Sequence, residues 1–99
     1  MGEEDTVEII RSSFGIVVWE DLRIHAERDG LILVSVPLDV MEVAMAFAGD
    51  KVADVEGWVA SGAIGKPDAA VLERVRQSPE LPFQMVICQP WVIAQMLPT

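Results

Sequence analysis

Few residues of this chain have side chains that could do chemistry. The sequence contains one histidine, His25, and one cysteine, Cys88. Asp29 follows His25 by four residues on a predicted helix, so its carboxylate could orient the imidazole ring and raise its pKa. A catalytic histidine also needs a nucleophile or a substrate group beside it. Neither Cys88 nor any serine stands in a recognisable local motif. We therefore predict no catalytic residue, and a small enzyme with an unrecognised site remains an alternative.

The sequence also contains no recognisable motif for binding a cofactor or a metal. A single cysteine excludes a disulfide within the chain and any multi-Cys metal site. Cys88 ends an apolar segment without a basic residue nearby in sequence, so we expect a buried and unreactive thiol. Acidic pairs such as Glu20-Asp21 lack the spacing of a calcium loop, and the glycine-rich segment 62–67 is too short for a phosphate loop. We predict no cofactor and no metal.

The charge balance excludes further classes of function. The 99 residues make a single domain, 1–99, and 16 acidic residues against 7 basic ones give a net charge of −9. Binding to nucleic acid or to an anionic membrane surface needs positive charge, so the sequence argues against both. The N-terminus has neither the basic nor the apolar region of a secretory signal. We expect a cytoplasmic protein.

The hydrophobic periodicity predicts an α+β fold, with about five short helices and a small sheet. The helices are predicted over residues 5–13, 19–28, 39–48, 51–61 and 69–77, and the strands over residues 31–36, 63–66 and 83–88. After Pro90 the pattern fits either a strand from Trp91 to Ala94 or a helix over residues 91–97. The β-branched Val92 and Ile93 favour the strand.

Two helix ends and one buried face follow from local residue types. Gly30 is expected to take the left-handed conformation that ends the second helix. Asp50 is expected to cap the fourth helix, and Gly62 to end it. We expect Trp58 to be largely buried between helices, because it shares one helix face with Val52, Val55 and Val59.

Residues 38–66 carry the pattern of two short helices joined by a tight turn. The informative pieces are Glu42-Val43-Ala44, Val55, Trp58 and Ser61-Gly62. With these the segment resembles the helix-turn-helix of excisionase-type and winged-helix proteins, which implies a winged-helix-like helical core. In such proteins the second helix enters the major groove of DNA. Here that helix carries Asp50, Asp54 and Glu56 against Lys51 alone, so its charge argues against DNA. A winged-helix-like transcription regulator, or a degenerate descendant of one, remains an alternative.

A second set of short motifs spans roughly residues 8–95. The pieces are Trp19-Glu20-Asp21-Leu22, His25-Ala26-Glu27-Arg28, Val43-Ala44, Trp58 with Ser61-Gly62, Lys66-Pro67 and Gln89-Pro90. On these pieces the whole chain resembles a family of small, uncharacterised prokaryotic proteins known only as a domain of unknown function. A proline commonly precedes the Trp-Glu-Asp-Leu segment in that family, where this chain has Val18. The resemblance implies a single domain from a bacterial cytoplasm and transfers no activity.

The C-terminal segment is uncharged, although the rest of the chain is acidic. Residues 81–99 contain none of the charged residues of the sequence. Such a segment is either a central strand covered by helices on both sides or an interface with a second copy across a two-fold axis. Because five short helices must also cover the strand at 31–36, we expect a homodimer. Its predicted interface residues are Phe83, Met85, Ile87, Trp91 and Ile93. The sequence therefore predicts a non-enzymatic, acidic interaction protein, for which an unidentified protein partner is a further option.

Overall fold

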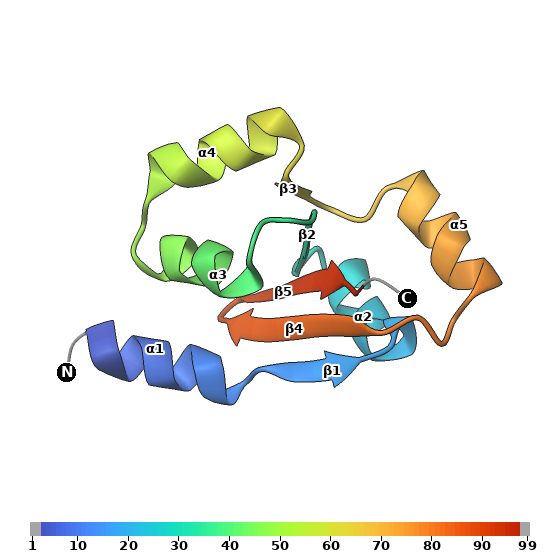
Figure 1. The fold of residues 1–99 in the computed structure, drawn as a ribbon, viewed down its shortest axis with the longest axis horizontal. Coiled ribbons are helices and arrows are strands. Elements are labelled where there is room, and N and C mark those ends of the chain that lie inside the picture. The colour runs from blue at the N-terminus through green and yellow to red at the C-terminus, as the bar shows by residue number, and fades with distance from the viewer. Residues whose placement is uncertain (1–2, 98–99) are drawn as a thin grey trace.

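The computed structural model describes residues 3–97, with the side chains of residues 6–97. These residues form an α+β fold (Figure 1). The five helices of this part of the chain are α1 Glu3–Ser12, α2 Trp19–Glu27, α3 Val40–Ala48, α4 Val52–Ser61 and α5 Ala69–Gln77. Its five strands are β1 Gly15–Val17, β2 Leu31–Val34, β3 Ile64–Gly65, β4 Phe83–Cys88 and β5 Trp91–Met96. The predicted fold class is confirmed.

All five strands belong to one mixed sheet. Their order is β1-β4-β5-β2-β3, in which β2 and β5 are parallel and the other neighbours are antiparallel. β4 and β5 form a hairpin, in which Val86 pairs with Ile93 and Cys88 with Trp91. The segment after Pro90 is therefore a strand, because its residues complete a ladder with β4 on one side and with β2 on the other.

Helices cover both faces of the central strands. Alternate residues of each strand point to opposite sides of the sheet, and the side chains on both sides are apolar. α1 and α3 cover what we call the first face, whose buried core is Ile10, Ile32, Val34, Val40, Val43, Ala44, Ile64, Val86, Cys88 and Ile93. α2 and α5 cover the second face, whose buried core is Leu22, Leu31, Val75, Phe83, Val92 and Ala94. The uncharged segment thus lies in the middle of the sheet. This central position is one of the two arrangements that the sequence allowed.

Two predicted helix ends are wrong by one residue or more. After α2 the left-handed residue is Asp29, at φ 59°, and not Gly30. Asp50 also adopts a left-handed conformation, at φ 55°, and Lys51 occupies the N-cap position of α4, so Asp50 does not cap that helix. Aspartate tolerates this conformation better than most residues because its short side chain can hydrogen-bond locally. Gly62 ends α4 at φ 81°, as predicted.

The fourth helix is less buried than predicted. Val52 and Val59 are exposed, and Trp58 is half-buried at the margin of the first-face core. The reason is that α4 packs mainly against α3 and β3, so a narrow stripe with Val55 and Trp58 reaches the core. Trp58 is therefore not enclosed between helices.

The strand β1 has no counterpart among the predicted elements. Its three residues follow directly after the turn that ends α1, and so short a segment gives no readable alternation. Within residues 3–97 no helix combines the length and the hydropathy needed to cross a membrane.

Candidate functional site

The two residues with the strongest chemical potential do not come together. His25 is half-buried on α2, which covers the second face, whereas Cys88 is buried in the first-face core. Burial raises the pKa of the Cys88 thiol, which favours the unreactive neutral form. Among the described residues, no three His, Cys, Asp or Glu side chains gather where they could hold a metal ion.

The five residues predicted for a dimer interface do not share one surface. Phe83 and Ile93 are fully buried within the chain, on the second and the first face respectively. Met85 and Ile87 are half-buried on the second face, and Trp91 is half-buried on the first. A second copy could reach only these last three. Self-association itself stays a prediction.

The segment 38–66 forms two helices followed by a strand. α3 and α4 pack against each other, and α4 leads into the two-residue strand β3. Asp54 and Glu56 are exposed on α4, and Lys51 precedes it. Because this surface is acidic, it suits phosphate binding poorly. The winged-helix resemblance stays a prediction.

One edge of the sheet is uncharged and apolar. We call this surface, Phe14 to Val18, the β1 edge; it forms the lower border of the sheet in Figure 1. The side chains of Phe14 and Ile16 are 47% and 57% exposed. Val18 continues the extended backbone up to the start of α2. No charged residue occurs from Ser12 through Trp19.

The opposite edge of the sheet is protected. Its strand, β3, has only two residues, and the next residue is Lys66. The Lys66 ammonium lies 3.1 Å from a carboxylate oxygen of Asp29. Short strands and lysines are devices that keep sheet edges from pairing with other chains. β1 is also short, with three residues, so the two edges differ mainly in charge, which only the β3 edge carries.

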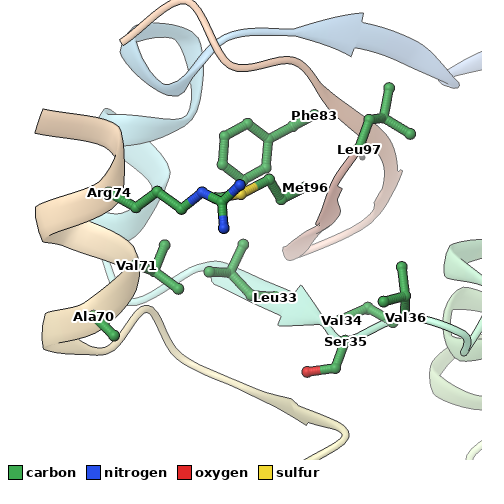
Figure 2. A pocket seen from close by; sticks show the side chains of 10 residues that line it. All are labelled: Leu33, Val34, Ser35, Val36, Ala70, Val71, Arg74, Phe83, Met96 and Leu97. Atoms are coloured by element: carbon green, nitrogen blue, oxygen red, sulfur yellow. The ribbon is translucent and has the colours of Figure 1, made fainter. Parts of the chain in front are cut away.

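A pocket opens between α5 and the second face. In Figure 1, α5 lies beside the sheet, and residues 66–68 and 78–82 join it to β3 and β4. The pocket has a volume of about 470 Å³ and is lined by Leu33, Val34, Ser35, Val36, Ala70, Val71, Arg74, Phe83, Met96 and Leu97 (Figure 2). Eight of these ten residues are apolar, and the only charged residue among them is Arg74.

Arg74 and the β1 edge were both missed from the sequence, although each leaves a signal there. Arg23 and Arg76 each have a glutamate three residues before them, and both form those ion pairs. Arg74 has no acidic residue three or four positions away on α5. The absence of charge between Ser12 and Trp19 likewise marks the β1 edge.

Comparisons with known proteins match this fold over nearly its whole length. A family model described as "Protein of unknown function (DUF2288)" matches residues 6–96. Among solved structures, the NMR solution structure of PA1075 from Pseudomonas aeruginosa is similar with a TM-score of 0.80 and 26% sequence identity. The match covers 95% of this chain and 87% of that one. No curated protein matches the sequence. The resemblance expected from the sequence motifs is confirmed.

Proposed function

The chain belongs to the family described as "Protein of unknown function (DUF2288)", and we propose that it is a non-enzymatic interaction protein that self-associates through the β1 edge. The family description names no activity, so the proposal rests on the surfaces of this chain. The exposed, uncharged edge of β1 is the observation that carries it. The separation of His25 from Cys88 supports the non-enzymatic part.

Charge limits where two copies of this protein can meet. Each chain has a net charge of −9, so most pairs of surfaces repel each other. The β1 edge is free of charge, and an edge strand presents unpaired backbone donors and acceptors. Two β1 strands can pair antiparallel across a two-fold axis, because such an interface uses the same surface of both copies. The pairing would join two sheets into one and bury Phe14 and Ile16.

The C-terminal segment contributes to this surface through β4. Gly15 of β1 pairs with Met85 of β4, and a Cβ placed on Gly15 would meet no atom within 4 Å. Open space therefore lies beside the half-buried Met85, at the margin of the β1 edge. The proposed interface is shifted by one strand from the one expected from the sequence, since β1 occupies the position outside β4.

Size-exclusion chromatography with light scattering tests this proposal on a matched pair of variants. We expect the wild-type protein to have twice the monomer mass of 10.8 kDa at micromolar concentration. Ile16→Lys places a charge on the β1 edge and should yield a monomer. Ile24→Lys, at a side chain that is 47% exposed on α2, should leave the dimer intact. Both variants lower the net negative charge equally, so general repulsion cannot explain a difference between them.

Two results would contradict the proposal. One is a wild-type protein that remains a monomer as its concentration rises. The other is a dimer that survives Ile16→Lys while circular dichroism shows that the variant is folded.

A further inference from the structure

The pocket between α5 and the sheet has the dimensions and the lining of a small-molecule site. Its volume of about 470 Å³ lies within the roughly 300–1,000 Å³ that is usual for ligand pockets. Phe83 and Met96 belong to the sheet side, and Val71 to the helix side. An apolar interior of this kind favours an apolar molecule or an apolar part of one.

Arg74 gives this apolar pocket one positive charge. Figure 2 shows its side chain reaching from α5 across the pocket toward Met96 and Phe83. No carboxylate within residues 6–97 forms an ion pair with Arg74, although the protein is strongly acidic. Its guanidinium group therefore keeps its donors available to a bound molecule.

A purely structural role explains Arg74 less well than it explains its neighbour. Basic residues in the last turn of a helix interact favourably with the helix dipole, and both Arg74 and Arg76 occupy that turn. Both arginines are exposed, but Arg76 lies 2.7 Å from a carboxylate oxygen of Glu73. Of these two arginines, only Arg74 lines the pocket. The dipole accounts for a basic residue at this end of α5, but not for the direction of the Arg74 side chain.

We propose that this pocket binds a small organic monocarboxylate with an apolar tail, whose carboxylate pairs with Arg74. Guanidinium and carboxylate groups match in a two-pronged, charge-assisted hydrogen bond. A single positive charge among the lining residues suits a monoanion, whereas a phosphate dianion would need a second cation. The tail would lie against Leu33, Phe83 and Met96. Phe14 and Ile16 of the β1 edge do not line this pocket, although Phe83 of its lining pairs with Val17 of β1.

An NMR titration of the 15N-labelled protein with sodium octanoate, below its micellar concentration, tests the site. We expect saturable shifts at the backbone amides of residues 33–36, 70–75 and 96–97. Arg74→Gln should weaken octanoate binding by roughly 10-fold or more, the loss expected when a charge-assisted contact is removed. Arg76→Gln, on the same helix, should leave the affinity unchanged.

Neutral 1-octanol has an apolar tail like that of octanoate but no carboxylate, so it shows how much of the affinity depends on the charge. We expect it to bind the wild-type protein more weakly than octanoate does, and with the same affinity to wild type and Arg74→Gln. Three results would overturn the proposal: no saturable shift at the pocket, octanoate binding undiminished in Arg74→Gln, or octanol binding as tight as octanoate. None of them bears on self-association, which the Ile16→Lys variant tests at a different surface.

Discussion

Gln84 of β4 donates a side-chain hydrogen bond to Gln95 of β5, with the amide nitrogen 2.6 Å from the amide oxygen. The amide nitrogen of Gln95 in turn donates to the backbone carbonyl of Leu38, also at 2.6 Å. Gln95 is 6% exposed, whereas Gln84 and Leu38 are half-buried, so these bonds lie at the margin of the core. They tie the two central strands to the loop that precedes α3.

Replacing Gln95 by leucine should therefore destabilise the protein. The change removes the partner of the Leu38 carbonyl and of the Gln84 amide, and an unsatisfied buried group costs about 1–3 kcal/mol. Because both residues are half-buried, we expect a loss of about 1–3 kcal/mol for the two groups together. Urea unfolding measures the loss. Gln77→Leu, at the exposed end of α5, is the control and should change the free energy of unfolding by less than about 0.5 kcal/mol. A Gln95→Leu protein as stable as the wild type would show that the buried hydrogen bonds contribute nothing.

The largest loss from a single core residue is expected at Phe83. Its side chain is fully buried, and its ring centroid lies 6.2 Å from that of Trp19. Phe83→Ala should cost about 3–5 kcal/mol, the usual range for a buried aromatic residue. Trp58→Ala should cost less, because Trp58 is only half-buried. Thermal unfolding of both variants compares them, and a greater loss at Trp58 would mean that α4 packs more tightly than this structure has it.

Gly57 in the middle of the fourth helix and Gly62 at its end should respond to alanine in opposite directions. A Cβ at Gly57 or at Gly62 would meet no atom within 4 Å, so neither substitution creates a clash. Gly57 lies inside α4, where alanine is favoured by about 0.5–1 kcal/mol. Gly62 has φ 81°, where a side chain costs roughly 1–2 kcal/mol. We expect Gly57→Ala to raise the melting temperature and Gly62→Ala to lower it; a change of the same sign in both would contradict the left-handed end of α4.

Cys88 should resist alkylation in the folded protein. Burial raises the pKa of its thiol above the ordinary value, so the thiol stays neutral near pH 7 while an unfolded chain ionises at lower pH. The folded state therefore loses stability as the pH rises past the pKa of the unfolded thiol. We expect iodoacetamide to modify native protein far more slowly than urea-unfolded protein. Equal rates in the two states would contradict the buried position.

The sequence predicted most elements because their signals are local. Asp68, for example, accepts a hydrogen bond from the Val71 amide and starts α5 as a typical N-cap residue. Alternation along residues 83–88 gave the bounds of β4 correctly. The errors arose where tertiary contacts decide. Asp29 has the left-handed conformation expected of Gly30, and Asp50 is left-handed and does not cap α4. Two valines of α4 face solvent because this helix packs mainly against α3 and β3.

Neither the β1 edge nor the pocket beside α5 could be located from the sequence. An uncharged segment shows that Phe83 and Ile93 avoid water, but not whether the same chain or a second copy covers them. Here the sheet order decides, since β1 and β2 flank the C-terminal hairpin. Arg74 becomes a candidate binding residue only because it lines the pocket that α5 forms with β2 and β5.

Isotope-filtered NOE spectroscopy on a mixture of labelled and unlabelled protein detects self-association through the β1 edge. Such a spectrum contains only contacts between two copies of the chain. We expect contacts from the Ile16 methyl groups of one copy to the β1 edge of the other, and their loss in Ile16→Lys. A wild-type spectrum without contacts at β1, or with contacts at a different surface, would contradict self-association through this edge.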